Sequence, residues 1–315
     1  MVQMQVPAAI AAQPRRQRTW RSKERPVAGL ITLPLLVPFL LFVIVPIGYV
    51  IYLSFTRFNG IGDPRWIGIG NYVAAMSDQS WWRAVGNTFI LGFGQMLIEL
   101  PVALFLAILL NRRLRLGGVY RTIYFVPHVI SVAVMGVVFY FLLRPLNGVI
   151  NGLLSPLGLV DPQMDWLGHD WSARLVLIVA SAWFGFGVNT VLFLVGLQTI
   201  PRELYESAAV EGANAWQQFR FIVLPLLAPV LRVVVMLSIV FSMRAFDIVK
   251  TLTGGGPAGA TDVMFTNLFN YFFGYDRGVQ YGYASALAVI ASIIIGILSI
   301  VYLLLSRTRN VEKAR

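Results

Sequence analysis

The sequence contains no cysteine and only two histidines, His128 and His169. Without thiols the chain cannot form a disulfide framework, a thiolate metal site or a cysteine nucleophile. Two imidazoles alone are also a poor basis for a zinc site. Charged residues are scarce as well, at 12% of the chain, where a soluble domain carries about a quarter. The composition therefore argues against a soluble metalloenzyme or thiol enzyme.

Hydrophobic residues are abundant, at 57% of the 315 residues, and the mean hydropathy is +0.73. These values are typical of membrane proteins. A helix that crosses a bilayer needs about 20 apolar residues. The sequence therefore predicts an all-α polytopic membrane protein with six transmembrane helices, at residues 29–54, 86–110, 119–143, 173–198, 223–246 and 283–306. The transmembrane domain, 29–306, lies between a basic tail, 1–28, and a short tail, 307–315.

The net charge of +11 is unevenly distributed. Six basic residues crowd the tail at 1–28, ahead of an apolar run that is too long for a signal peptide. An even number of spans puts both tails on one side, together with the links at 111–121 and 199–222. This side holds most of the Lys and Arg, which makes it cytoplasmic. A nucleic-acid arm is the disfavoured alternative, since a basic flank commonly accompanies a first membrane helix; no nucleic-acid partner is expected.

Residues 199–229, TIPRELYESAAVEGANAWQQFRFIVLPLLAP, form a polar, helix-forming insert between two apolar runs. Thr199 can cap a helix whose first turn suits Pro201. Gly212 ends that helix and permits a tight turn, and a second short helix is expected at 214–222. An interfacial loop without a partner is the plainer interpretation. The excess of acidic residues argues against it, because helices that bind lipid are usually basic.

The order and spacing of Glu206-Ser207-Ala208, Gly212, Ile222 and Leu224-Pro225 resembles the EAA loop of the membrane subunits of binding-protein-dependent ABC importers. In that family the loop is the cytoplasmic contact with an ATPase. Ser207 stands where the family usually has alanine, a residue of nearly the same size. The resemblance implies an ATPase-coupling surface made by Leu204, Tyr205, Glu206, Ser207, Ala208 and Gly212.

Further resemblance covers most of the chain. The first outer loop is similar to the family's at Gly70-Asn71-Tyr72, Trp82 and Asn87-Thr88, and the third span and its loop at Pro127, Ser131, Gly148 and Asn151. The stretch from Phe246 to Pro257 is similar to the carbohydrate (maltose/glycerol-phosphate-type) branch. Carried over by position, the resemblance implies a sugar site at Phe184, Gly185, Val188, Met243 and Arg244. We add Asn189 and Asp247, because amides and carboxylates suit sugar hydroxyls.

Charged residues inside the predicted spans require partners or a cavity. Arg244 and Asp247, three residues apart, can neutralise each other on a helix, or Arg244 can also bind an acidic or hydroxyl-rich substrate. Glu99 and Arg232 lie at similar depth and predict a structural interhelical ion pair, with a proton relay as the weaker alternative. His128 is interpreted as a packing or interfacial residue.

Taken together, the sequence is identified as one of two permease subunits of an ATP-driven importer for a sugar, an oligosaccharide by preference, in a bacterial or archaeal cytoplasmic membrane. No GxxxxGK[ST] phosphate loop is present, so no enzyme activity and no cofactor are expected here. ATP and Mg would be bound by two partner ATPase subunits. The other implied partners are a second permease subunit, an extracytoplasmic binding protein, the lipid bilayer and the sugar. The alternative is an ion-coupled secondary transporter, which predicts internal repeats that the sequence does not display.

Overall fold

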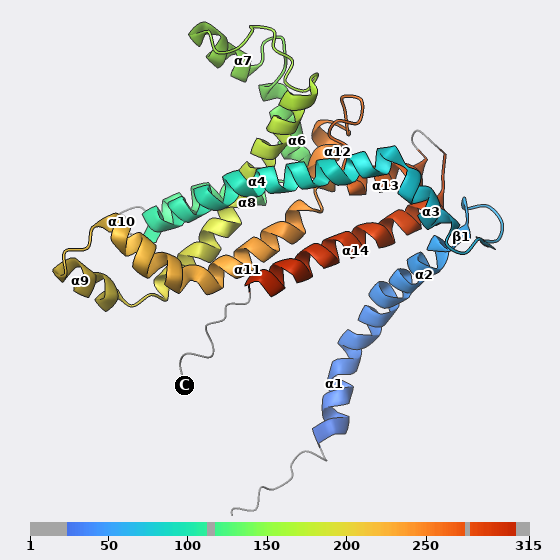
Figure 1. Ribbon diagram of the computed structural model, residues 1–315, viewed down its shortest axis with the longest axis horizontal. Helices are drawn as coiled ribbons and strands as arrows, with labels where there is room; N and C mark the ends of the chain where they lie inside the picture. Colours follow the sequence, from blue (N-terminus) through green and yellow to red (C-terminus); the bar gives the residue numbers. More distant parts are fainter. Residues whose placement is uncertain (1–23, 112–116, 275–277, 307–315) are drawn as a thin grey trace, which may run out of the picture. The chain divides into compact units, whose positions relative to one another are not determined.

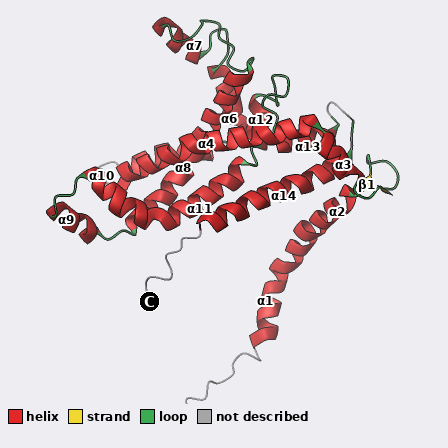
Figure 2. Cartoon of the chain, in the orientation of Figure 1, coloured by secondary structure: helices red, strands yellow, loops and turns green. Residues whose placement is uncertain are grey.

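The computed structural model describes residues 24–111, 117–274 and 278–306, and these are almost entirely helical (Figures 1 and 2). The chain divides into two units, Met1–Tyr49 and Val50–Arg315. The predicted tails at 1–28 and 307–315 fall largely or wholly outside the described residues, as do Arg112, Arg113 and Arg115 of the link at 111–121.

The first unit contains α1 (Glu24–Phe39), a π-helical turn η2 (Leu40–Ile44) and the start of α2 (Val45–Ser54). Pro46 has no N–H to donate to the preceding turn, which is a common cause of such local rewinding. The stretch Thr32–Ser54 is long and apolar enough to cross a membrane. Most of its side chains are exposed, and only Leu53 and Ser54 at its C-terminal end are buried among its described side chains, as expected for a segment that is solvated by lipid.

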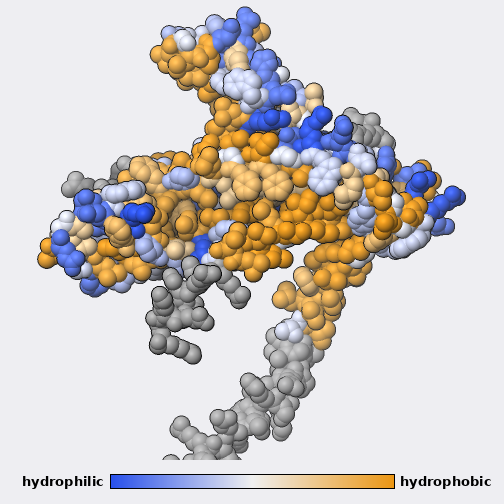
Figure 3. Space-filling model, in the orientation of Figure 1, coloured by the Kyte–Doolittle hydropathy of each residue, from blue (hydrophilic) through white to orange (hydrophobic). Residues whose placement is uncertain are grey.

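The second unit is built on four long helices, α4 (Gln79–Asn111), α8 (Asp170–Gln198), α11 (Leu224–Ser242) and α14 (Tyr281–Ser306). They run alongside one another, with α4 packed along α8 and α11 in contact with α4, α8 and α14 (Figure 1). Small residues such as Ala103 and Ala107 let the backbones approach around Phe193. The outward surface of these helices is apolar (Figure 3). With Thr32–Ser54, they make five potential membrane spans among the described residues.

The third predicted span, 119–143, is not one helix. It is divided into α5 (Gly117–Val129) and α6 (Val132–Leu142), and Ser131 between them has an extended backbone with φ −59° and ψ 138°. The interruption follows Pro127 and His128 within a mostly apolar stretch, and an average of hydropathy over the whole span does not reveal it. The fifth predicted span also differs, because α11 ends at Ser242 and a short helix, α12 (Phe246–Leu252), follows after a break.

The loops that were predicted to be outer contain ordered elements of their own, which agrees with the turn residues in the sequence. These are strands β1 (Thr56–Arg57) and β2 (Arg65–Trp66), which pair antiparallel, and helices α3 (Gly70–Ser77), α7 (Val149–Leu154), η3 (Ser155–Leu157) and α13 (Met264–Phe273). At the opposite end of the long helices lie α9 (Arg202–Val210), α10 (Ala215–Gln218) and a π turn, η4 (Phe219–Val223) (Figure 1).

Three asparagines that the family resemblance singles out hold these loops together. The Asn71 amide donates to the carbonyls of Ser54 and Thr56, at 2.9 and 2.8 Å. Asn87 donates to two carbonyls of the loop that precedes α13. Asn151 donates to two carbonyls on either side of its own loop. Each amide ties a loop to backbone carbonyls that lie elsewhere in the chain, so these residues build the fold.

Asp78 fixes the outer end of α4. One carboxylate oxygen accepts hydrogen bonds from the N–H groups of Ser80 and Trp81, at 2.9 and 3.2 Å. The other accepts from the hydroxyls of Tyr271 and Tyr283, both at 2.9 Å. Burial opposes ionisation, but these hydrogen bonds outweigh it and hold the pKa of Asp78 below its ordinary value.

We expect Asp78→Asn to lower the free energy of unfolding at pH 7 by about 1–3 kcal/mol, since it weakens a helix cap and two bonds to a charged acceptor. The folded pKa lies below the unfolded one, so the carboxylate stabilises the protein above about pH 4 and this contribution is lost as the pH falls through the folded pKa. Thermal unfolding of the detergent-extracted protein between pH 7 and pH 3 should show the difference shrinking. Asp161→Asn, at an exposed loop, is the matched control and should change little.

Candidate functional site

A cavity of about 480 Å³ opens within the second unit, between α4, α8 and the two interrupted segments α5–α6 and α11–α12. This is within the size range of small-molecule sites. Six of the seven residues predicted for the sugar site line it: Phe184, Gly185, Val188, Asn189, Arg244 and Asp247. The structure therefore brings together residues that are up to 63 positions apart in the chain (184 to 247).

The enclosed end of the cavity contains a polar network from three helices. The Glu99 carboxylate, 4% exposed, accepts hydrogen bonds from the Gln95 amide at 2.7 Å and from the Asn189 amide at 2.5 Å. Asn189 also donates to the Ser238 hydroxyl at 3.0 Å. Helices α4, α8 and α11 are thus joined at one point. Only Asn189 of this network is among the residues predicted for the sugar site.

Gly185 provides the space for this carboxylate. A Cβ atom at position 185 would lie 2.4 Å from Glu99 Oε1 and 2.7 Å from its Cδ, which is well inside van der Waals contact. The absence of a side chain on α8 is therefore what allows Glu99 to lie flat against that helix and reach Asn189. The predicted role of Gly185 as a sugar contact stays a prediction.

We expect Gly185→Ala to displace the Glu99 carboxylate, break its hydrogen bond with Asn189 and destabilise the protein by about 1–3 kcal/mol, the usual cost of overpacking. Thermal unfolding measures the loss. Gly86→Ala on α4 is the matched control, because a Cβ there meets nothing within 4 Å and alanine favours a helix. Equal stability of Gly185→Ala and wild type would show that the carboxylate does not occupy this space.

Arg244 and Asp247 lie at the exposed end of the cavity and do not form the expected ion pair. The i, i+3 rule assumes a continuous helix, whereas α11 ends at Ser242 and α12 begins at Phe246. The break between the two helices therefore removes the geometry on which that rule depends. No interaction of either side chain is found within the described residues, so both charged groups remain available to a ligand.

Met243 is the one predicted sugar residue that does not line the cavity. It is fully buried and packs with Met96 and Ile239. Gly92 of α4 makes room for it, since a Cβ there would lie 2.3 Å from the Met243 methyl carbon. Position alone could not show that the end of α11 turns this residue into the core.

The expected ion pair between Glu99 and Arg232 is also absent. Glu99 is held by the amides described above. The Arg232 side chain donates to the carbonyls of Ala228 and Ser306, at 3.2 and 3.1 Å, so it caps the C-terminal end of α14. Equal depth in the membrane suggested a pair, but each side chain is held by other partners.

His128 lines the cavity beside Phe184, with their ring centroids 5.1 Å apart. Sequence reasoning assigned this histidine only to packing. It did not identify Gln95, Ser238 or Phe241, which also line the cavity. Gln95 lies four residues before Glu99, and that helical spacing was the one available signal.

The 199–222 loop forms a hook of two helices, but the second is not the separate short helix that was expected, because α10 continues through η4 into α11. α9 ends at Val210, Gly212 then adopts a left-handed backbone with φ 82°, and α10 begins with a capping box between Asn214 and Gln217. Tyr205 packs inward against the core of α4, α8 and α11, and Ala208 is half-buried. The other predicted coupling residues, Leu204, Glu206, Ser207 and Gly212, are exposed.

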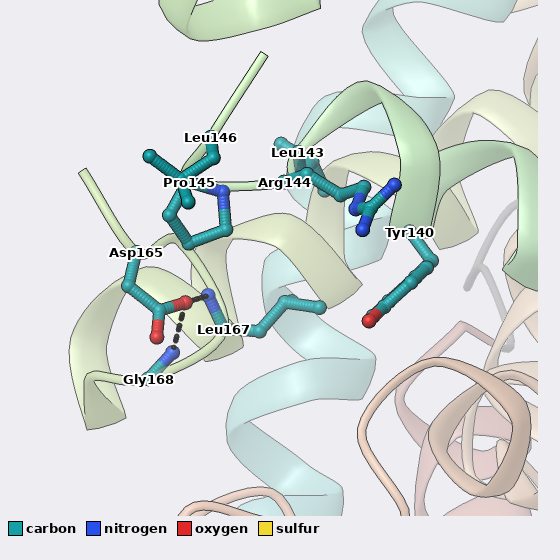
Figure 4. A pocket seen from close by; sticks show the side chains of 8 residues that line it. All are labelled: Tyr140, Leu143, Arg144, Pro145, Leu146, Asp165, Leu167 and Gly168. Atoms are coloured by element: carbon teal, nitrogen blue, oxygen red, sulfur yellow. Dashed lines mark hydrogen bonds between the residues drawn. The ribbon is translucent and has the colours of Figure 1, made fainter. Parts of the chain in front are cut away.

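A second cavity, of about 410 Å³, lies in the outer loops around Arg144 and Asp165 (Figure 4). One Asp165 carboxylate oxygen accepts hydrogen bonds from the N–H groups of Leu167 and Gly168, at 3.1 and 2.9 Å. The Arg144 guanidinium lies 5.5 Å from the Phe141 ring centroid. Asp165 and Arg144 already make contacts with neighbouring residues of the chain. The cavity between α4, α8, α5–α6 and α11–α12 is therefore the better candidate site.

Comparison with known proteins gives a consistent result. Residues 99–310 match the family model described as binding-protein-dependent transport system inner membrane component. The trehalose/maltose transport system permease protein MalF of Thermococcus litoralis is 35% identical over 91% of this chain and 96% of its own. The arabinooligosaccharides transport system permease protein AraP of Bacillus subtilis is 31% identical over 92% and 93%. A chain of a bacterial ABC transporter involved in the import of the acidic polysaccharide alginate superposes with a TM-score of 0.77 and 25% identity, over 90% of this chain and 96% of that chain.

Proposed function

We propose, from the premise that this chain belongs to the family of binding-protein-dependent transport system inner membrane components, that it forms half of an ATP-driven import pathway for an oligosaccharide. It is a multi-pass membrane protein and the permease subunit of an ABC transporter for sugars. Such subunits are not enzymes, because ATP is hydrolysed by separate ATPase subunits. Because the chain belongs to this family, the alternative of an ion-coupled secondary transporter is set aside.

The cavity lined by Phe184, Asn189 and Arg244 is the proposed sugar site. The observation that carries this proposal is that residues chosen by position in the family meet around one cavity of suitable size. An aromatic ring offers an apolar face to a sugar ring, while an amide, a carboxylate and a guanidinium offer partners for its hydroxyls. The buried Met243 packs behind the residues that line the cavity.

The hook formed by α9 and α10 is the proposed contact with an ATPase, on the cytoplasmic side. It presents Glu206 and Ser207 to solvent and anchors itself through Tyr205. η4 joins it directly to α11, which reaches the cavity at Ser238. Movement of the hook would therefore be transmitted to the sugar site through one helix. ATP and Mg would be bound by two ATPase subunits, and a second permease subunit and an extracytoplasmic binding protein would complete the complex.

Purification of the tagged chain from its native membrane tests the assembly. We expect a second permease and two copies of ATPase subunit to copurify. Proteoliposomes that contain this complex should accumulate oligosaccharide only when ATP and the binding protein are both supplied. Uptake driven by a proton or sodium gradient without ATP would contradict the proposal.

A further inference from the structure

The hydrogen bonds at the enclosed end of the cavity show which polar atoms there are donors and which are acceptors. Asn189 has two N–H donors on its amide nitrogen, and it directs them to Glu99 Oε1 and Ser238 Oγ. Gln95 directs an N–H to Glu99 Oε2. The donors of Asn189 are thereby used within the protein. Its remaining polar atom is the acceptor Oδ1.

Glu99 has acceptor capacity left. A carboxylate offers about four lone-pair sites, and the two amides use one on each oxygen. Glu99 itself lines the cavity, and no cation pairs with it among the described residues. The enclosed end thus presents lone pairs from Glu99 and Asn189 and lacks a counter-charge for an anion.

The charged residues around the whole cavity also favour a ligand that donates hydrogen bonds over an anionic ligand. Two carboxylates, Glu99 and Asp247, line it against one guanidinium, Arg244. Arg244 and Asp247 are at the exposed end, while Glu99 is at the enclosed end. A carboxylated sugar unit that moved inward past Arg244 would find acceptor oxygens and no cation to pair with at the enclosed end, so its carboxylate would lose its hydration without compensation. A neutral sugar unit would instead donate its hydroxyl hydrogens to these acceptors.

We propose that Glu99 is a specificity-determining residue that accepts hydrogen bonds from the hydroxyls of a neutral oligosaccharide and rejects uronic acid units. The proposal rests on the proposed function, because it assumes that the cavity holds the transported sugar. It distinguishes this chain from the alginate-importing structure that shares its fold, whose substrate is an acidic polysaccharide.

Direct binding to the assembled complex tests this selectivity. The complex is reconstituted in nanodiscs, held with ATP and vanadate, and titrated without binding protein, so that only the cavity discriminates. The probes are tritiated neutral trisaccharides (maltotriose and arabinotriose) and tritiated trigalacturonate. Wild type should bind the better neutral probe at least about tenfold more tightly than trigalacturonate. Glu99→Gln, which replaces an acceptor oxygen by a donor group, should weaken neutral binding about tenfold to a hundredfold and reduce the ratio of the two dissociation constants.

That ratio, taken from one sample, does not depend on the fraction of folded complex, so a purely structural role of Glu99 would leave it unchanged. Glu99→Asp should restore part of the preference, because it keeps the acceptor. The control is Phe184→Ala, which removes a sugar-facing ring and should weaken both probes equally. An unchanged ratio in Glu99→Gln together with weakened binding in Phe184→Ala would overturn the role of Glu99 and leave the proposed function intact. Tighter binding of trigalacturonate to wild type would also overturn it. Unaltered binding in both variants would remove the sugar from this cavity altogether.

Discussion

Glu206→Lys should abolish ATP-driven uptake while the protein still inserts in the membrane and folds. Glu206 is exposed on α9 and has no resolved contact that a lysine would break, so the folded chain should tolerate the change. The proposed contact with the ATPase is charge-assisted and contributes about 1.5–3 kcal/mol. Reversal of the charge replaces that attraction by repulsion. Uptake into proteoliposomes and copurification of the ATPase are the two measurements.

The matched control for this variant is Glu203→Lys, which reverses a charge one turn earlier on the same helix, outside the residues that match the family motif. We expect it to retain uptake and ATPase association. Full uptake and full association in Glu206→Lys would show that α9 does not couple this subunit to an ATPase.

Arg244→Ala should reduce sugar transport at least about tenfold, the worth of one hydrogen bond from a charged donor. The guanidinium is exposed at the open end of the cavity and can bind a carboxylate in bidentate fashion or several hydroxyls. The affinity of the binding protein for sugar and the basal ATPase rate should not change, because those sites are on other chains. Arg83→Ala, an exposed arginine of α4 that does not line the cavity, is the control.

A second substitution at the same position identifies what Arg244 recognises. Arg244→Gln keeps hydrogen-bond donors but removes the charge, so it should preserve transport of a neutral sugar far better than transport of an acidic one. Unimpaired uptake in Arg244→Ala would remove this residue from the pathway.

The sequence predicted the fold well where hydropathy carries the information. Five long apolar helices and the hook between the fourth and fifth predicted spans appear as expected, because membrane solvation requires apolar residues over a whole span. The interruptions at Ser131 and at Met243–Ala245 were not predicted. The first lies in a mostly apolar stretch, where a hydropathy average changes little, and the second falls at the edge of a predicted span, where boundaries are least certain from sequence.

The site was predicted in part, and its errors share one cause. Equal depth in the membrane suggested an ion pair for Glu99, and helical spacing suggested one for Arg244, yet partners in a membrane protein depend on which faces of helices meet. Glu99 binds Asn189 because Gly185 leaves room for it, and Arg232 reaches a helix end instead. The sequence carries no periodic signal for a glycine on the facing helix, or for a backbone carbonyl at the end of a distant helix.

The two helix interruptions border the same cavity, and this has a mechanical consequence. Beyond them, α6 and α12 pack tightly together: a Cβ on Gly136 would lie 2.8 Å from the Thr251 hydroxyl oxygen. Both helices also share a buried core with α4 and α8, to which Met135, Val249 and Leu177 belong. A change in the width of the mouth would therefore require buried side chains of α6 and α12 to slide past those of α8. The energy needed to admit a ligand then depends on these side-chain contacts, which substitution can tune more finely than backbone hydrogen bonds.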